Sequence, residues 1–264
     1  MKLGIIGLGN MATAMLGGII GAGLVKAEDI SGSDYSEAAG RAIEEKLGIH
    51  TGTDNLAAIK NAEIVILAVK PQVYDTVLNQ IKGHVSAGQV VISIAPGKTL
   101  SYLEGYFGGD KKIVRLMPNT PALVGEGCTG VCKNGNVSDE EFKTVMALLN
   151  SFGKAYEVTE NQMDAVVAIS GSSPAYVFML IEAMADGAVA EGLPRKTAYE
   201  MAAQAVLGSA KMVLETGRHP GDLKDMVCSP AGTTIEAVGV LEAEGFRGAV
   251  IDAVRTCADK SRNL

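Results

Sequence analysis

The chain has 264 residues, of which 47% are hydrophobic and 20% charged, and its formal net charge at pH 7 is -7. This length allows two domains with hydrophobic cores, and the acidic balance argues against nucleic acid or an anionic membrane as a partner. No basic segment or cleavage site precedes Leu3, and the longest apolar run, 175–190, is interrupted by Glu182 and Asp186. We therefore expect neither a signal peptide nor a membrane-spanning helix.

The cysteines and histidines form no pattern typical of a metal site. Cys128 and Cys132 are spaced C-x3-C in a predicted strand, which places their side chains on one face but roughly 13 Å apart. That separation is too large for one metal ion or a disulfide. We predict no metal, reduced thiols and a cytoplasmic location. The other residues of these two types are Cys228, Cys257, His50, His84 and His219.

The first predicted element is an apolar strand at 3–6 that continues into Gly7-Leu8-Gly9-Asn10-Met11-Ala12 and then into a helix. A strand, the pattern G-x-G-x-x-G/A and a helix together form the pyrophosphate-binding turn of dinucleotide folds. Gly7 allows a turn too tight for a Cβ atom, Gly9 lets the backbone approach the pyrophosphate, and Ala12 lets the helix pack closely. The unpaired N–H groups of the first helical turn would face the phosphate. The alternative is a tight strand-to-helix turn that binds no ligand.

The second predicted strand, 30–33, ends at Ser33 and Asp34. An acidic residue at this point can accept a hydrogen bond from a ribose 2′-OH and would repel a 2′-phosphate. Ser33 and Ser36 could instead help to hold a phosphate. Ser36 also opens the helical pattern 36–47, so the segment can be explained as a helix N-cap, and the two roles are compatible.

The run 64–69 is continuously apolar, which is typical of a strand buried on both faces. It ends at Lys70 and Pro71. Because ligands bind at the carboxyl ends of strands in parallel sheets, Lys70 is placed to meet a cofactor phosphate or amide. A solvated strand end is the alternative. The other elements predicted here are a strand near His50, a helix starting at 53–55, strands at 90–94 and 113–117, edge strands at 127–131 and 155–158, and a helix at 139–152.

This alternation predicts an α/β protein in which residues 1–160 form a Rossmann-type, doubly wound, mostly parallel sheet with helices on both faces. Residues 161–264 show no strand pattern and are predicted to be helical. Helices are expected at 174–191, 194–216, 233–243 and 247–262, with Thr233 or Thr234 capping the third. These helices are apolar on more than one face, which predicts an obligate dimer through this domain. The alternative is a monomeric bundle docked on the first domain.

The second domain contains the segment Ser229-Pro230-Ala231-Gly232-Thr233-Thr234-Ile235. It combines hydroxyl groups, small residues and the start of a helix, and these features can together bind an anion such as a carboxylate. A plain helix N-cap is the alternative explanation.

The chain resembles the pyrroline-5-carboxylate reductases in five blocks that occur in the family's order. They are 7–11, Ala68-Val69-Lys70-Pro71, Met117-Pro118-Asn119-Thr120-Pro121, Ser170-Gly171-Ser172-Ser173-Pro174-Ala175-Tyr176 and 229–235. The last two blocks are specific, whereas many dehydrogenases share the first. The resemblance spans nearly the whole chain. It implies reduction of 1-pyrroline-5-carboxylate to L-proline, the last step of proline biosynthesis, usually with NADPH. It also implies a helical dimerisation domain, in some members assembled into a ring of five dimers.

The resemblance implies roles for individual residues. Pyrophosphate would be held by Gly7, Leu8, Gly9, Asn10 and Met11, and the adenosine ribose would meet Ser33 and Asp34, with Asn55 nearby. The nicotinamide side would be lined by Val69, Lys70 and Ala95, with Ala68 and Pro71 also assigned to the cofactor. The substrate would be held by Ser229, Gly232, Thr233 and Thr234, with backbone N–H groups on its carboxylate, and Glu160 matches an acidic residue near the substrate.

Three positions depart from the family's pattern. Ser173 and Ala231 stand where the family usually has glycine, which adds a small side chain but removes no functional group. Asp34 stands where many members carry a serine for a 2′-phosphate. NADH therefore remains possible beside NADPH.

The implied chemistry needs little acid catalysis, because a protonated imine carbon is already electrophilic. Positioning and a dry site can supply most of the rate. Thr234 is our candidate for the hydrogen bond to the ring nitrogen, and we predict that Thr234→Ala lowers turnover at least roughly tenfold. A 3-hydroxyacid-type dehydrogenase would instead need a proton donor at the substrate oxygen, for which Lys211 is the one candidate. A non-catalytic dinucleotide sensor would not need the 229–235 segment.

Overall fold

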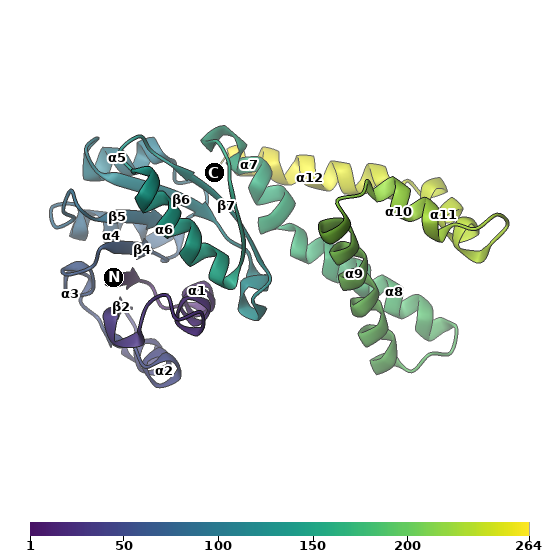
Figure 1. The fold of residues 1–264 in the computed structure, drawn as a ribbon, viewed down its shortest axis with the longest axis horizontal. Helices are drawn as coiled ribbons and strands as arrows, with labels where there is room; N and C mark the ends of the chain where they lie inside the picture. The colour runs from purple at the N-terminus through teal and green to yellow at the C-terminus, as the bar shows by residue number, and fades with distance from the viewer. Residues whose placement is uncertain (264) are drawn as a thin grey trace. The chain divides into compact units, whose positions relative to one another are not determined.

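The computed structural model describes residues 1–263 (Figure 1). Contacts divide it into a first unit, Met1–Ser172 together with the chain from Cys257 onward, and a second unit, Ser173–Thr256. The division falls later than the boundary predicted after residue 160. Two contacts account for the difference, because Met163 is fully buried in the core of the first unit and Asp164 accepts a hydrogen bond from Ser261 at 2.6 Å.

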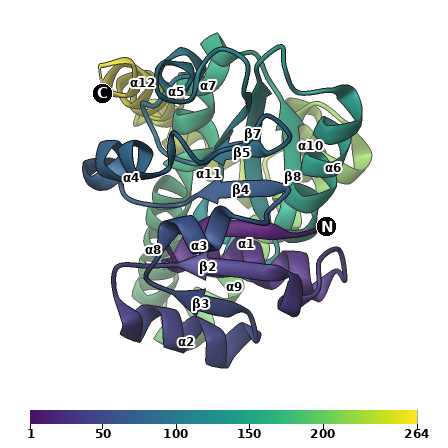
Figure 2. The same cartoon turned by 90° about the vertical axis from the view of Figure 1, so that its left-hand side faces the viewer.

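The first unit is built on one eight-stranded sheet with the order β3-β2-β1-β4-β5-β6-β7-β8. Figure 2 labels β3, β2 and β4 in this order across the sheet, and β1, next to the N-terminus, lies between β2 and β4. All neighbouring strands are parallel except β6 and β7. The strands are β1 Leu3–Ile6, β2 Ile30–Ser33, β3 His50–Gly52, β4 Ile64–Leu67, β5 Val90–Ser93, β6 Lys112–Met117, β7 Gly127–Lys133 and β8 Gly153–Glu157. The predicted fold class, a doubly wound sheet followed by helices, is confirmed.

One strand lies elsewhere than predicted. The strand at 127–131 was expected at an edge, but β7 lies between β6 and β8, antiparallel to β6 and parallel to β8. A 3-10 helix at Thr120–Val124, ended by Gly125 with a φ of 78°, connects β6 to β7. This connection has no long crossover helix, so β7 runs back along β6. Only β8, of the two strands predicted at the edge, lies there.

Helices cover both faces of the sheet because the strand side chains alternate between two apolar clusters. Ile5 belongs to the cluster that packs on α1, α2 and α6, whereas its neighbour Ile6 belongs to the cluster that packs on α3, α4 and α5. This alternation is the period of two expected for a strand buried on both faces. The helices of the first unit are α1 Asn10–Gly21, α2 Glu37–Leu47, α3 Asn55–Ile59, α4 Tyr74–Ile81, α5 Leu100–Phe107, α6 Asp139–Leu149 and α7 Met163–Val166.

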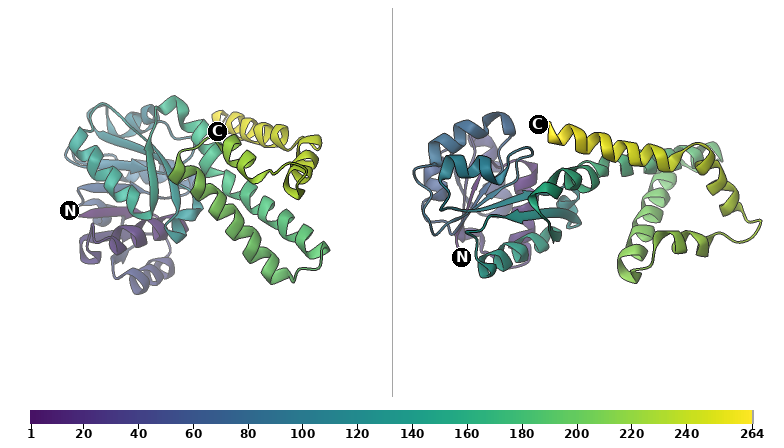
Figure 3. Two further views of the ribbon diagram at one scale, coloured as in Figure 1. Left: turned by 45° about the vertical axis from the view of Figure 1, so that its right-hand side comes forward. Right: turned by 90° about the horizontal axis from the view of Figure 1, so that it is seen from above.

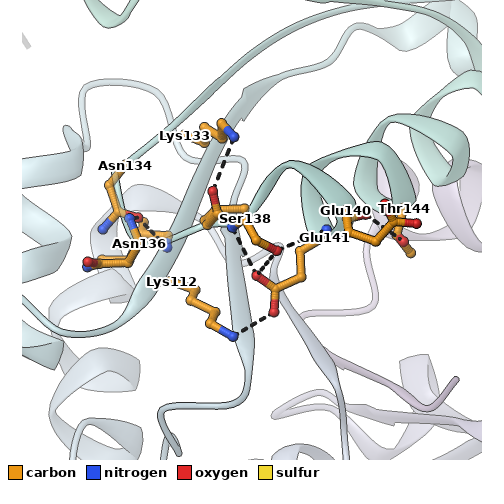
Figure 4. Close-up of polar contacts among 10 residues, drawn as sticks. Lys112, Lys133, Asn134, Asn136, Ser138, Glu140, Glu141 and Thr144 are labelled. Carbon is orange, nitrogen blue, oxygen red and sulfur yellow. Dashed lines mark hydrogen bonds and ion pairs between the residues drawn. The ribbon is translucent and has the colours of Figure 1, made fainter.

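Helix α6 illustrates how local sequence fixes these elements (Figure 4). Ser138 accepts a hydrogen bond from the N–H of Glu141, and the Glu141 side chain accepts from the N–H of Ser138, which completes a capping box. Lys112 of β6 pairs with Glu141 at 2.6 Å. The start of α6 is thereby tied to the sheet, and such a cap stabilises a helix by roughly 1 kcal/mol.

The second unit is helical, and Figure 3 shows its helices. They are α8 Ser173–Ala190, α9 Arg195–Thr216, α10 Pro220–Val227, α11 Thr233–Ala243 and the first part of α12 Phe246–Arg262. The short helix α10 was not predicted; its Pro220 sits in the first turn, a position where proline is well tolerated. The N-cap of α11 is Gly232, with no side-chain cap, so the predicted capping by Thr233 or Thr234 was wrong.

The second unit buries little of its own apolar surface. Its core cluster contains three buried residues, Ala185, Ala198 and Ala202, within the part of the chain that the structure describes. Larger apolar side chains stay exposed, including Phe178 at 62% and Leu214 at 74%. A surface of this kind is typical of an obligate protein interface.

The helical segment Glu160–Ala190 is long and apolar enough to cross a membrane, judged by length and composition alone. The expected absence of a membrane-spanning helix stays a prediction, although the helical path begins well before residue 175. Glu182 and Asp186 lie inside the segment, and carboxylates are costly in hydrocarbon. Packing against another protein surface explains its exposed apolar side chains better than lipid does.

Candidate functional site

The glycine turn has the geometry that a dinucleotide requires. Gly7 has a φ of +93°, and a Cβ atom there would lie 2.7 Å from the carbonyl oxygen of Ala68. A Cβ atom on Gly9 would meet no atom within 4 Å, so the space above this residue is open. Gly9 is the N-cap of α1 and no side chain caps that helix. The first-turn N–H groups of α1 are therefore oriented as in helix ends that bind phosphate.

Two of the five residues predicted to hold pyrophosphate use their N–H groups inside the protein. The N–H of Gly7 donates to the carbonyl of Ser33 at 2.8 Å. The N–H of Leu8 donates to Oδ2 of Asp34 at 2.9 Å. Gly9, Asn10 and Met11 follow on the exposed side of the turn. The predicted contacts of these three residues with pyrophosphate stay a prediction.

A cavity of about 530 Å³ opens beside this turn. It lies at the carboxyl ends of β1, β2 and β4, where the strand order reverses between β1 and β4. That switch point is where open α/β sheets bind their ligands. Among the predicted cofactor residues, the cavity brings together Gly7, Ser33, Asp34, Asn55 and Val69.

An amide-rich wall of the cavity was only partly predicted. Ser33 Oγ donates to Asn55 Oδ1 at 2.7 Å, and Asn55 Nδ2 donates to Gln80 Oε1 at 2.7 Å. Gln80, on α4, was not singled out from the sequence because no motif in the adjacent residues indicates a role in binding. Thr53 and Tyr35 also line the cavity and were missed, although Tyr35 directly follows Asp34 and Thr53 lies two residues before Asn55.

The residues predicted for the nicotinamide side differ in exposure. Ala68 and Val69 are half-buried and only Val69 lines the cavity, whereas Lys70 and Pro71 are exposed. Ala95 is buried and donates its N–H to Ser93 Oγ at 3.3 Å. The structure thus gives Lys70 and Ala95 no place in the wall of this cavity, and their contacts with a cofactor stay a prediction.

A buried hydroxyl pair joins the start of α4 to the end of β5. The Tyr74 hydroxyl donates to Ser93 Oγ at 2.5 Å, and neither side chain reaches solvent. Burial raises the pKa of Tyr74 far above its ordinary value, and the hydrogen bond with Ser93 opposes this only in part. Tyr74 begins α4 after the Lys70–Pro71 turn, so the pair ties this turn to the one that follows β5.

Glu160 takes part in a structural ion pair. Its Oε1 accepts hydrogen bonds from the N–H of Leu100 at 2.6 Å and from Arg115 Nη1 at 3.2 Å. Arg115 is buried, and its Nε has no hydrogen-bond partner among residues 1–263. Burial, with the added repulsion of Glu160, raises the pKa of the nearby Cys132 thiol to about 11. A substrate contact of Glu160 stays a prediction.

Asn119, in the Met117–Pro121 block, anchors the Ser170–Tyr176 block. Its Nδ2 donates to the carbonyl of Ser170 at 2.9 Å, and its Oδ1 accepts from the N–H of Cys128 at 2.8 Å. Ser170 lies in a π-helix, Val167–Gly171, a feature often found at functional sites. Burial raises the pKa of Cys128, and its hydrogen bond with Ser170 partly opposes this.

In the second unit, Ser229–Gly232 forms a tight turn before α11. The N–H of Gly232 donates to the carbonyl of Ser229 at 3.1 Å, and Ala231 has a φ of +56°. Proline at the second position and positive φ at the third are typical of a type II turn, which favours glycine at the third position. Ser229 and Thr233 are exposed and Thr234 is half-buried. Uncapped N–H groups beside these hydroxyls can bind a carboxylate.

Lys211, the candidate proton donor of a hydroxyacid dehydrogenase, is exposed and lies 3.5 Å from Glu215, one helical turn away. This is the arrangement of a solvated helix face. No group of three or more histidine, cysteine or acidic side chains within residues 1–263 is arranged to hold a metal ion.

Comparisons with known proteins cover both the sheet domain and the helical domain. Residues 160–264 match the family model described as pyrroline-5-carboxylate reductase dimerisation, and residues 2–97 match the model described as NADP oxidoreductase, coenzyme F420-dependent. The pyrroline-5-carboxylate reductase of Escherichia coli K12 is 50% identical over 263 residues, covering 100% of this chain and 98% of that protein. The chain belongs to the pyrroline-5-carboxylate reductase family.

Solved structures extend the comparison to the whole fold. A pyrroline-5-carboxylate reductase from Coxiella burnetii has a TM-score of 0.93 at 35% identity, covering 99% of this chain and 97% of that one. The enzyme from Plasmodium falciparum, solved with NADP bound, has a TM-score of 0.89 at 35% identity, with coverages of 99% and 97%. The predicted family is therefore confirmed. The matches support a nicotinamide dinucleotide as the cofactor of this chain, which also carries the family's dimerisation domain.

Proposed function

We propose that this chain reduces 1-pyrroline-5-carboxylate to L-proline with a reduced nicotinamide dinucleotide. The observation that carries the proposal is the open glycine turn beside a cavity at the sheet's switch point, in a chain 50% identical over its length to a pyrroline-5-carboxylate reductase. The resemblance implies NADPH, whereas Asp34 favours NADH. We place the reaction in the cytoplasm as the last step of proline biosynthesis.

The first unit would hold the coenzyme. The N–H groups of Gly9, Asn10 and Met11 would bind its pyrophosphate at the start of α1. Ser33, Asp34 and Asn55 would meet the adenosine ribose, and the strand ends at Val69–Lys70 and Ala95 would border the nicotinamide. Once bound, the coenzyme supplies the hydride that reduces the imine carbon.

The second unit would hold the substrate. N–H groups at the uncapped start of α11, with the hydroxyls of Ser229 and Thr233, would bind the substrate carboxylate. The Thr234 hydroxyl would hydrogen-bond the ring nitrogen and hold the protonated imine in one orientation. Excluding water and fixing this orientation would supply most of the rate, since no strong acid is needed at carbon.

We further propose that the chain forms a homodimer through the helices of the second unit. The exposed apolar side chains of α8 and α9 support this, because the buried core of that unit contains three alanines within its described residues. A second copy of the chain would cover them. A ring of five dimers is the higher assembly that the resemblance implies.

The proposal is tested by measuring how fast the purified protein oxidises NADPH and NADH in the presence of 1-pyrroline-5-carboxylate. A parallel assay measures oxidation of short 3-hydroxyacids. We expect turnover of the imine alone. Thr234→Ala should lower turnover at least roughly tenfold, equivalent to about 1.4 kcal/mol of barrier. Thr216→Ala is the matched control, because its hydroxyl donates to the carbonyl of Met212 within α9 and belongs to none of the residues assigned to the substrate. No imine-dependent oxidation of either coenzyme would refute the proposal, and an unchanged Thr234→Ala variant would remove Thr234 from it.

A further inference from the structure

The carboxylate of Asp34 is held in place from two sides. Its Oδ2 accepts the N–H of Leu8, inside the glycine turn, at 2.9 Å. Its Oδ1 accepts the N–H of Ser36, the N-cap of α2, at 3.0 Å. A carboxylate oxygen can accept more than one hydrogen bond. Asp34 is therefore fixed as part of the turn, yet each oxygen retains capacity for one more donor.

The cavity next to Asp34 contains negative and neutral side chains. Its wall includes a second carboxylate, Asp54, and no lysine or arginine is among the described residues that line it. Arg41 of α2 does not compensate, because its guanidinium pairs with Glu37 at 3.3 Å. Arg41 and Glu37 border a different hollow of the surface, together with Glu44.

These features separate the two nicotinamide coenzymes, which differ in a phosphate on the adenosine ribose. A free 2′-OH can donate to the remaining acceptor position of Asp34. A 2′-phosphate would instead bring a charge of about -1.5 to -2 beside a fixed carboxylate, with no cation in the wall to offset it. Asp34 cannot rotate away without leaving the N–H groups of Leu8 and Ser36 unpaired.

We propose that Asp34 makes NADH the preferred coenzyme of this chain and makes NADPH the poorer one. The inference rests on the proposed function for its catalytic consequence, but it concerns the binding of the dinucleotide by the first unit alone. It separates this chain from the relative whose structure was solved with NADP bound. We expect a preference for NADH of at least tenfold, both in affinity and in kcat/KM.

The test measures the dissociation constants of NAD⁺ and NADP⁺ by titration calorimetry, which requires no turnover. Wild type should bind NAD⁺ at least tenfold more tightly. Asp34→Ser should lower that ratio at least tenfold, because it removes the charge. Asp34→Asn separates charge from hydrogen bonding: it keeps one acceptor oxygen for the turn, and it should shift the ratio in the same direction. Glu45→Gln removes an exposed carboxylate of α2 that lies outside the cavity and leaves the Arg41–Glu37 pair intact, so it should leave the ratio unchanged.

Thermal unfolding of each variant, with and without NAD⁺, controls for damage to the glycine turn. Tighter binding of NADP⁺ than NAD⁺ by wild type, or an unchanged ratio in both folded Asp34 variants, would overturn the inference. The kinetic measurement then uses 1-pyrroline-5-carboxylate with NADH and NADPH. If NAD⁺ binds more tightly than NADP⁺ but neither reduced coenzyme reduces the imine, the inference is supported and the proposed function is refuted. The two failures are therefore distinguishable.

Discussion

The side-chain amide of Asn119 joins the carbonyl of Ser170 to the N–H of Cys128, with donor–acceptor distances of 2.9 and 2.8 Å. Both bonds are formed by a buried side chain. They connect the turn after β6 to the π-helix that precedes α8, so one residue satisfies backbone groups of two distant segments. A buried amide in this position holds both segments in one arrangement.

Asn119→Ala should lower the free energy of unfolding by about 2 to 4 kcal/mol, because it leaves a buried N–H and a buried C=O without partners. Urea denaturation of the wild type and variant at equal protein concentration measures the difference. Asn79→Ala is the control, because Asn79 also bonds to a backbone carbonyl but is exposed on α4. The control should stay within about 0.5 kcal/mol of wild type. A similarly small change for Asn119→Ala would show that the two buried bonds are dispensable.

Tyr74→Phe should lower stability at pH 8 by about 1 kcal/mol, because Ser93 Oγ loses the buried Tyr74 hydroxyl and keeps the N–H of Ala95, while the ring is retained. The pH dependence of this difference follows from the raised pKa of Tyr74. Below the ordinary tyrosine pKa of about 10, both the folded and the unfolded chain carry the neutral phenol. Above it, the unfolded chain releases the proton first, so the contribution of Tyr74 is lost as pH rises.

Denaturation at pH 8 and pH 10.5 measures this linkage. Wild type should lose about 0.8 kcal/mol more than Tyr74→Phe over that interval, from ionisation of the unfolded tyrosine. The raised pKa of Cys132 also destabilises the fold at alkaline pH, but it does so in both proteins and cancels in the comparison. Equal losses in the two proteins would mean that Tyr74 ionises as readily in the folded state as in the unfolded state.

Glu160→Gln should mainly lower the free energy of unfolding, and not the affinity for the substrate. The Arg115 side chain is 4% exposed, and it would keep its charge without the partner carboxylate. Removing one member of a buried pair costs about 3 to 5 kcal/mol, and we expect about 2 to 3 here because Glu160 is 34% exposed. Glu157→Gln, on the exposed side of β8, should change little. A variant with wild-type stability and a raised KM for the imine would instead assign Glu160 to the substrate.

The sequence predicted those parts of the fold that short-range patterns determine. The glycine turn, the apolar strands and the limits of α2 follow from local residue types, since Ser36 caps α2 and Gly48 ends it with a φ of 72°. What could not be predicted depends on contacts between distant residues. The bond from Leu8 to Asp34 joins positions 26 residues apart, and the pairing of Asn55 with Gln80 joins positions 25 apart. Neither pairing can be inferred from the residues that adjoin its members in the sequence.

The placement of β7 was missed for a related reason. The residues of β7 are compatible with either an edge or an interior strand, and only pairing with β6 and β8 decides between them. At the start of α11 the local sequence itself misled the prediction, because two threonines suggested a side-chain cap where Gly232 is the N-cap. That result matters for function, since an uncapped helix start leaves its N–H groups for a ligand.

Ala231→Gly should stabilise the protein. Ala231 has a φ of +56°, in the left-handed region, which costs a residue with a Cβ atom about 1 to 2 kcal/mol. Glycine removes that strain but adds about 0.4 to 1 kcal/mol of chain entropy to the unfolded state. A net gain of about 0.5 to 1 kcal/mol remains. Ala237→Gly, in the interior of α11 and exposed, makes the same chemical change at helical φ and should cost about 1 kcal/mol. The expected changes in the free energy of unfolding have opposite signs in the two variants, and urea denaturation at matched protein concentration measures both. Equal destabilisation of both would contradict a strained turn at Ala231.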